Sequence, residues 1–334
     1  MKTALITGAA GFIGFHAAKR WLDDGWRVVG VDAFSEYYDP QLKRDRAAML
    51  AASPNYVEIE GKIQTPGLLA DALAQYTPEV VVHLAAQAGV RFSIEAPRTY
   101  VESNLQGTFE LLEAARATLP KHLLLASTSS VYGANTVMPY AETHKADAQM
   151  SFYAATKKAN EAMAHSYAHL YGLPITMFRF FTVYGPWGRP DMALFKFVKA
   201  ILRGEAIDVY NHGNMLRDFT YIDDLIEAVR QLSEVVPKAG VPVSDVDSLS
   251  PVAPFRVVNI GKAKPDSLAD FISEIEAALG QDSRKNLMDM QPGDVPATWS
   301  DTSLLKALTG FEPGTELSQG IPEFVTWYRQ YYDV

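Results

Sequence analysis

The chain has 334 residues, and its 30 Lys and Arg residues against 39 Asp and Glu residues give a formal net charge of −9. A protein that neutralises phosphates needs a basic face, so this balance argues against nucleic acid as a partner. The chain contains no cysteine, which excludes disulfides, thiolate metal ligands and a cysteine nucleophile. We expect no metal site.

No stretch approaches the roughly 18 apolar residues of a membrane-spanning helix. The N-terminal segment MKTALITGAAGFIG passes directly into a patterned domain, without the small-residue cleavage site of a signal peptide. We therefore expect a cytoplasmic protein without a membrane partner.

Short apolar runs alternate with helix-length segments in the first part of the chain. We expect strands at residues 3–7, 28–32, 56–60, 80–84 and 123–127, and helices at residues 12–23, 104–118 and 151–171. The runs VVVHL and HLLLAS are apolar on both alternating faces, which is typical of strands that helices cover on both sides. The pattern predicts an α/β fold with a Rossmann-type, doubly wound parallel sheet.

Glycines and prolines interrupt this pattern after residue 180. We predict a first domain at residues 1–180 and a smaller C-terminal α/β substrate domain, mainly at residues 181–334. Residues 210–230 and 255–262 are expected to return to the first domain. Residues 236–254 are rich in Pro, Ser and Val, so we expect a mobile surface loop there.

A glycine-rich segment follows the first expected strand and opens the first expected helix. Gly8, Gly11 and Gly14 permit a tight turn and let backbone N–H groups approach a pyrophosphate. Asp32 ends the second strand, where a carboxylate can accept hydrogen bonds from both ribose hydroxyls. It would repel a 2′-phosphate, which favours NAD over NADP. Glycines that serve only a tight turn are the alternative.

Tyr153 and Lys157 are four residues apart in SFYAATKKANE, so they project from one face of a helix that Ser151 can cap. The run ASTSSVYG ends the fifth expected strand, and its Thr128 can meet the tyrosine. A phenol has a pKa of about 10, and a nearby ammonium would bring it toward neutral pH. Tyr153 could then act as a base, although the alternative is a buried structural tyrosine.

These motifs resemble the extended short-chain dehydrogenase/reductase family, which includes NAD-dependent epimerases. The stretches AAQAGVRFSIEAP, SFYAATKKANE, RFFTVYGPWGRPDMALFKF, LRDFTYIDD and QPGDVPATWSD are similar to the UDP-glucuronate 4-epimerases. The resemblance implies epimerisation of UDP-glucuronate to UDP-galacturonate at C4, with tightly held NAD and a role in polysaccharide biosynthesis. It also implies a homodimer through the helices at 104–118 and 151–171.

The resemblance assigns roles in catalysis and cofactor binding. Tyr153 is the implied base, Thr128 assists it, and Lys157 holds the nicotinamide ribose. The implied cofactor-binding residues are Gly8, Gly11, Phe12, Ile13, Gly14, Asp32, Leu84, Ala85, Ala86, Tyr153 and Lys157.

The resemblance also assigns substrate contacts. Arg217 is the implied diphosphate clamp, unless it forms a surface pair with Asp218. Arg189 is a candidate sugar or phosphate contact, unless it braces its loop through a salt bridge. The remaining candidates are Arg91 as a weaker contact, Phe197 and Val209 at the uracil, and Asp294 at the ribose.

Three of these substrate residues have a structural alternative as well. Phe197 and Val209 are equally readable as core, and Asp294 can simply fix the PGD turn. His83 lies in an apolar strand run, so we interpret it as structural.

Four hydroxyl residues are candidates for holding the substrate carboxylate, and they are Thr128, Ser129, Ser130 and Thr182. Neutral hydroxyls bind an anion less firmly than an arginine pair, which suits a sugar that must rotate. The alternative is that Ser129 and Ser130 merely end a strand.

Two positions depart from the family pattern. Lys62 stands where an acidic residue is expected to bind adenine, and Ala33 stands where an asparagine is usual. We therefore expect altered adenine contacts while Asp32 still selects NAD.

Two other functions compete with epimerisation. A sugar-nucleotide decarboxylase or dehydratase needs acidic residues beside the catalytic threonine, where Ser129 and Ser130 stand here. A non-catalytic NAD-binding scaffold would be expected to have lost Tyr153 or Lys157, and both are present.

Overall fold

The computed structural model describes residues 1–291 and 294–334. Seven parallel strands form one sheet in the order β11-β6-β5-β4-β1-β2-β3. They are β1 Thr3–Thr7, β2 Arg27–Asp32, β3 Tyr56–Glu60, β4 Val80–His83, β5 His122–Ala126, β6 Ile175–Phe180 and β11 Phe255–Ile260. The strand order reverses between β1 and β4, and a ligand crevice is expected at the carboxyl ends of the strands there.

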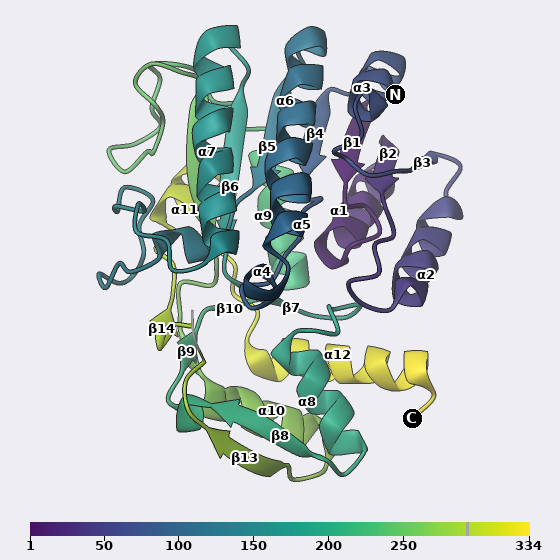
Figure 1. Cartoon of the computed structure of the whole chain (residues 1–334), viewed down its shortest axis with the longest axis vertical. Helices are drawn as coiled ribbons and strands as arrows, with labels where there is room; N and C mark the ends of the chain where they lie inside the picture. Colours follow the sequence, from purple (N-terminus) through teal and green to yellow (C-terminus); the bar gives the residue numbers. More distant parts are fainter. Residues whose placement is uncertain (292–293) are drawn as a thin grey trace.

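Helices cover both faces of this sheet (Figure 1). One face packs against α1 Phe12–Asp23, α9 Ile222–Leu232 and α11 Ser303–Thr309. The other packs against α3 Leu68–Tyr76, α6 Gly107–Thr118 and α7 Phe152–Tyr171. Helix α2, Pro40–Ala51, follows β2 and lies beside α1 and β3. Two separate apolar cores result, which confirms the expected doubly wound α/β fold.

A smaller α/β region lies below the sheet in Figure 1. Its helices are α8 Ala193–Leu202, α10 Leu268–Leu279 and α12 Leu317–Tyr332, and β8 Ala206–Tyr210 pairs with β13 Arg284–Met288. Its core is aromatic, with Phe219 and Phe271 stacked at a centroid distance of 4.2 Å. Short strands join the two regions: β7 Thr182–Tyr184, β9 Leu216–Arg217, β10 Phe219–Tyr221, β12 Asp266–Ser267 and β14 Ala297–Thr298.

The segments expected to return to the first domain behave differently from each other. Residues 255–260 form β11 at the edge of the main sheet, beside β6. In contrast, β10 pairs with β7 outside that sheet, and only the following helix α9 packs beside α1. The domain boundaries themselves stay predictions.

The loop at 236–254 is fastened to the protein more firmly than a mobile loop would be. Asp247 and Arg256 form a buried ion pair, with Nε donating to Oδ1 at 2.8 Å. His165 and His169 of α7 also contact Ser250 and the Val252 carbonyl oxygen. Our expectation of mobility did not anticipate these contacts, and the two histidine partners lie more than 80 residues away in sequence.

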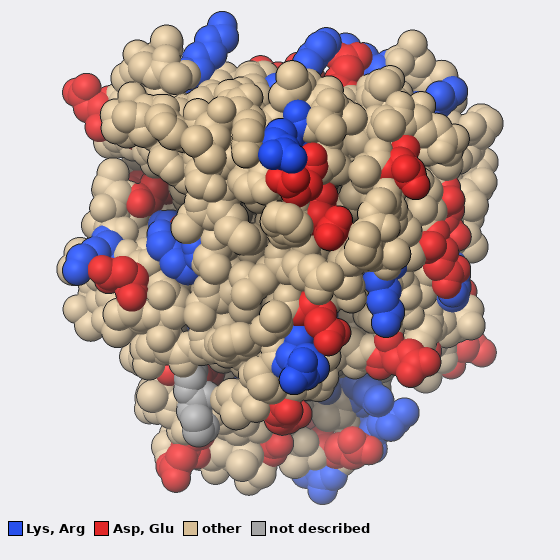
Figure 2. All heavy atoms as spheres, turned by 45° about the horizontal axis from the view of Figure 1, so that its top comes forward, with Lys and Arg blue, Asp and Glu red and all other residues tan. Residues whose placement is uncertain are grey.

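The face shown in Figure 2 carries acidic and basic residues interspersed among a larger uncharged area. Among the described residues, no helix has both the length and the apolar character needed to cross a membrane.

Candidate functional site

The glycine-rich turn between β1 and α1 brings backbone close to backbone. Gly8 has a φ of +73°, and a Cβ there would lie 2.8 Å from the amide nitrogen of Ala85. A Cβ at Gly14 would overlap the carbonyl oxygen of Gly8. Both positions therefore need glycine, and α1 begins against the turn with its first N–H groups free of intrahelical partners.

A cleft of about 430 Å³ opens at this turn. All the expected cofactor residues line it: Gly8, Gly11, Phe12, Ile13, Gly14, Asp32, Leu84, Ala85, Ala86, Tyr153 and Lys157. Asp32 is oriented by two backbone donors, Ala10 N to Oδ2 at 2.9 Å and Phe34 N to Oδ1 at 2.8 Å. The turn, helix start and oriented carboxylate fit a dinucleotide.

Both departures from the family pattern, Ala33 and Lys62, line the same cleft. So does Lys43 of α2, which we did not single out from the sequence. Its Nζ donates to Ser35 Oγ at 2.8 Å. Burial lowers the pKa of Lys43 to about 8, while the Asp32 carboxylate acts in the opposite direction. The Lys43 amine is therefore positioned beside Asp32. The sequence did not predict this, because it depends on how α2 packs.

A second cleft, of about 780 Å³, adjoins the first. The residues common to both linings are Tyr37, Thr128, Tyr153, Phe181, Arg189 and Met192. Thr128 follows the end of β5, and Tyr153 lies in the first turn of α7, which Ser151 caps by accepting from Ala154 N at 3.1 Å. The proposed catalytic pair thus stands where the two clefts meet.

Positive charge reaches Tyr153 from an unexpected direction. Burial raises the pKa of Tyr153, while the Thr128 hydroxyl and the Arg189 charge act to lower it. Lys157 Nζ instead donates to the Ala126 carbonyl oxygen at 2.9 Å, and burial lowers the pKa of Lys157 to about 8. We expected a nearby ammonium to act on the phenol, and the structure adds the charge of Arg189, which we did not expect.

A buried ion pair supports this junction from behind. Arg179 donates to both oxygens of Glu161 at 2.9 Å, and Ser127 Oγ donates to Oε1 at 2.7 Å. Burial alone would raise the pKa of Glu161, but Arg179 and Lys158 lower it to about 2. These contacts tie α7 to the end of β5, immediately before Thr128.

Asn104 provides a second support that we did not predict. It lies in η1, Val101–Gln106, a π-helical segment, which is a feature common at functional sites. Its Oδ1 accepts from Gln87 N at 2.8 Å, and its Nδ2 donates to Thr156 Oγ1 at 3.0 Å. Thr156 in turn donates to the Tyr153 carbonyl oxygen at 2.8 Å. The sequence NLQGT around Asn104 contains no motif that predicts these hydrogen bonds.

The larger cleft gathers most of the expected substrate residues. Its lining includes Arg91, Thr128, Ser129, Ser130, Thr182, Arg189, Phe197, Arg217 and Asp294. Val209 does not belong to it: this side chain is 3% exposed and packs in the aromatic core, because strand alternation turns it inward. Its neighbour Tyr210 lines the cleft and faces the guanidinium of Arg91 at 4.9 Å.

Two of the three arginines that line this cleft, Arg189 and Arg217, are paired with carboxylates. Arg189 forms two hydrogen bonds to Asp191, which is the loop-bracing pair we considered as an alternative. Arg217 Nη2 donates to Asp294 Oδ1 at 2.8 Å, so the pairing of Arg217 with Asp218 is wrong. Pro292 and Gly293 of the expected PGD turn lie outside the described residues.

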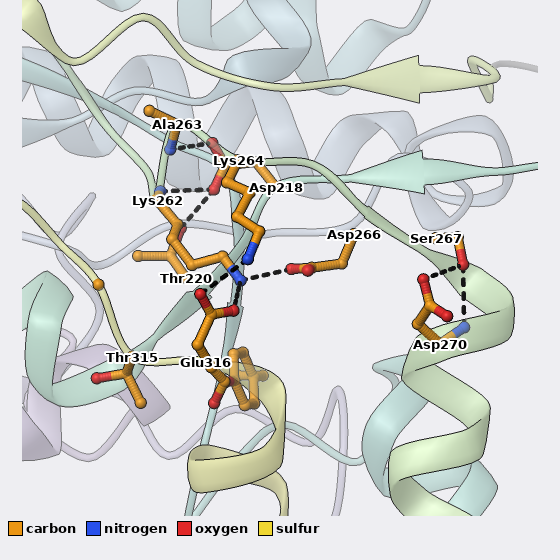
Figure 3. Close-up of polar contacts among 12 residues, drawn as sticks. Asp218, Thr220, Lys262, Ala263, Lys264, Asp266, Ser267, Asp270, Thr315 and Glu316 are labelled. Atoms are coloured by element: carbon orange, nitrogen blue, oxygen red, sulfur yellow. Dashed lines mark hydrogen bonds and ion pairs between the residues drawn. The ribbon is translucent and has the colours of Figure 1, made fainter.

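Asp218 has a different partner set, and Figure 3 shows its contacts with Lys262 and Ala263. It is fully buried and accepts from the backbone nitrogens of Lys262, Ala263 and Ser300, and from the hydroxyl of Ser300. Arg217 and Asp218 therefore point to opposite sides of β9 and its continuation. The buried carboxylate anchors the backbone from which Arg217 reaches the cleft.

His83 lies between hydroxyls, with Nδ1 2.7 Å from Thr7 Oγ1 and Nε2 3.3 Å from Thr108 Oγ1. Burial lowers its pKa to about 3, so it is neutral at pH 7. Among the described residues, no group of three or more His, Cys, Asp or Glu could hold a metal ion.

The chain is similar to known proteins over most of its length. Residues 4–242 match the model of the NAD dependent epimerase/dehydratase family. The chain is 54% identical over 331 residues to a probable UDP-glucuronate 4-epimerase of Rhizobium meliloti, covering 98% of this chain and 97% of the relative. It is 44% identical over 335 residues to UDP-glucuronate 4-epimerase 4 of Arabidopsis thaliana, covering 99% of this chain and 76% of the relative.

A solved structure is similar over the whole chain. It is UDP-glucuronic acid 4-epimerase from Bacillus cereus in complex with UDP-glucuronic acid and NAD. The TM-score is 0.88 and the identity 32%, with 99% of this chain and 100% of that chain covered.

Proposed function

The chain belongs to the NAD-dependent epimerase/dehydratase family, and from this membership we propose that it interconverts UDP-glucuronate and UDP-galacturonate at C4 with bound NAD. The observation that carries the proposal is the meeting of two clefts at Thr128 and Tyr153. A hydride can pass between ligands only where their sites adjoin. The names and ligands of the similar proteins support the same substrate and cofactor.

Each side chain at the junction has a defined task. Tyr153 takes the proton of the sugar O4 and later returns it, which is general base and then general acid catalysis. Thr128 lines both clefts together with Tyr153, and its hydroxyl acts to lower the pKa of the phenol. Bound NAD would supply the hydride acceptor for C4, and its cationic ring would favour the phenolate. Lys157 lines the cofactor cleft, where its ammonium can hold the nicotinamide ribose.

The sugar must turn over between the two hydride transfers. Arg217 anchors the diphosphate, so that the uridine end stays bound while the sugar end rotates. Asp294 orients Arg217 by accepting from Nη2, and Phe197 lines the same cleft from α8. Thr182, together with Ser129 and Ser130, offers neutral donors to the carboxylate in either orientation.

Decarboxylation is the competing outcome, because oxidation at C4 makes the substrate a β-keto acid. A decarboxylase requires an acid or base near C5 and C6. Ser129 and Ser130 line the larger cleft next to Thr128, where neither can serve as such a group at neutral pH. These serines therefore favour epimerisation.

The experiment that tests this function is direct. The purified protein is incubated with UDP-glucuronate, and the sugars are resolved. UDP-galacturonate must form up to an equilibrium mixture without net reduction of added NAD. Formation of a pentose nucleotide as the main product would instead indicate a decarboxylase.

We further propose a homodimer through α6 and α7. These helices pack side by side (Figure 1) and expose large apolar side chains: Phe109, Leu119, Leu170 and Tyr171. Such a face is typical of a protein interface. Light scattering should give twice the chain mass, and a concentration-independent monomer would reject the dimer.

A cytoplasmic location and a role in polysaccharide biosynthesis complete the proposal. A chain without cysteine suits a reducing compartment, although it does not require one. Cell fractionation and the uronic acid content of cell polysaccharides, compared with and without the protein, test these two points.

A further inference from the structure

Arg46 is a fully buried arginine of α2 whose guanidinium reaches two segments that lie far apart in sequence. Its Nη1 donates to the carbonyl oxygen of Ala10, in the glycine-rich turn, at 2.9 Å. Its Nη2 donates to the carbonyl oxygens of Trp187 at 2.6 Å and Gly188 at 3.3 Å. The residue is 0% exposed, so its charge depends on these acceptors and on Tyr38 Oη, to which Nη1 also donates at 2.9 Å. One side chain thus joins the cofactor turn to residues 186–191, here called the 186–191 loop.

Two further donors from the cofactor side hold the same loop at its ends. His16 Nε2 lies 3.0 Å from the Pro186 carbonyl oxygen. Burial lowers the pKa of His16 to about 4, so the ring is neutral at pH 7 and Nε2 carries the proton that the carbonyl accepts. At the other end, Tyr37 Oη donates to Asp191 Oδ2 at 3.1 Å.

The backbone of the loop is strained at Trp187. Trp187 has a φ of +60°, which is unusual for a bulky residue. Its ring lies 5.7 Å from that of Phe15 and 5.3 Å from that of Trp327. Backbone strain of this kind persists only where the surroundings determine the conformation, and it is concentrated at functional sites.

The loop carries Arg189 to the junction of the two clefts, where it lines both. Resting on the proposed function, we propose that Arg46 is a positioning residue that couples the glycine-rich turn to the 186–191 loop and so holds Arg189 beside Tyr153. Arg46 acts through the loop rather than on the substrate. It makes the position of a substrate-cleft cation depend on the backbone of the cofactor cleft.

This coupling has a consequence for the acid limb of the pH profile. The groups that face Tyr153 are Thr128, Arg189, the ring of Tyr100 at 6.0 Å, and Lys157 one turn later in α7. The Arg189 charge lowers the pKa of Tyr153, so a displaced Arg189 raises it. A base that must be phenolate then becomes active only at higher pH.

Arg46→Lys tests the coupling because it keeps the charge but cannot reach both segments. Arg44→Lys is the matched control on the same helix, since Arg44 is exposed and pairs with Glu60. Arg46→Lys should lower kcat by up to about 100-fold, the cost of a misplaced catalytic group. Its acid limb should move to higher pH, and amide hydrogen exchange of the 186–191 loop should rise. The control should change none of these.

A second variant and a double-variant cycle complete the test. Tyr37→Phe removes one donor to the loop and should move the acid limb in the same direction. Arg46→Lys should add no further shift in an Arg189→Gln background, because the two act through one group. The proposal is wrong if the acid limb of the pH profile stays unchanged in a variant that folds. It is also wrong if the shifts caused by Arg46→Lys and Arg189→Gln are fully additive. Exchange of the loop is independent of turnover, so unchanged exchange contradicts the coupling, whereas an inactive wild type contradicts the proposed function.

Discussion

The cofactor cleft takes its shape from backbone, whereas the substrate cleft takes its shape from side chains. Gly8 and Gly14 lie in one turn and create the first cleft through close backbone approach. Arg217 and Asp294 meet although they lie 77 positions apart in sequence, and Arg189 enters from a separate loop. A cleft shaped by backbone suits a nucleotide cofactor of constant shape. A cleft shaped by side chains suits a sugar that must rotate.

The largest effect is expected at the junction of the clefts, because Tyr153 lines both of them. Tyr153→Phe keeps the ring and removes the ionisable oxygen. Epimerisation should fall by about 10²–10⁴-fold, the usual contribution of general acid–base catalysis. NAD retention and the thermal unfolding midpoint should stay near those of the parent. Near-normal turnover would remove Tyr153 from its assigned role.

One variant changes only the backbone of the cofactor cleft. Gly14→Ala places a Cβ against the carbonyl oxygen of Gly8, where backbone must shift. Overpacking of this kind costs about 1–3 kcal/mol, so NAD affinity should fall by roughly 10- to 100-fold. UDP affinity should change little. Gly314→Ala is the control, since the nearest atom is 3.9 Å from its added Cβ. Unchanged NAD titrations would contradict the backbone origin of this cleft.

Another variant changes only a side chain of the substrate cleft. Arg217→Gln removes a charged donor to the diphosphate, and hydrogen bonds to charged groups contribute about 1.5–3 kcal/mol. The KM for UDP-glucuronate should rise about 10-fold while NAD affinity is kept. Arg203→Gln, at the exposed end of α8, serves as a control. If NAD affinity falls together with substrate affinity, the two clefts are not as separate as described.

The smallest effect concerns the fate of the oxidised sugar. Thr182→Val keeps the shape and deletes a hydroxyl that we assign to the carboxylate. Turnover should slow by a few-fold, roughly the loss of one hydrogen bond, and the released pentose share should increase. Thr118→Val, at the end of α6, is the matched control. No change in either turnover or pentose would reject this role of Thr182.

The same difference between the clefts explains what the sequence could predict. The cofactor turn is local, so strand, glycines and helix appear together in one short stretch, and the expected helix at 12–23 matches α1. The expected strand at 56–60 likewise matches β3. The motif residues around Thr128 and Tyr153 could be paired because a single crossover separates them.

The sequence could not predict contacts that depend on tertiary assembly. Val209 was readable as a uracil contact or as core, and the register of β8 turns it into the core. Arg217 was expected at the diphosphate or in a pair with Asp218, and the structure pairs it with Asp294 rather than with Asp218. Arg46 and Glu161 showed no signal at all, because a buried arginine and a buried glutamate look like surface charges in a helical pattern.

Transient transfer of one hydride at C4 is the central claim, and a label at that carbon tests it most directly. UDP-glucuronate carrying deuterium at C4 is converted by the protein in ordinary water with its bound NAD. We predict that the UDP-galacturonate formed retains the deuterium at C4, because the same hydride returns to the opposite face. Loss of the deuterium to solvent during conversion would contradict the account.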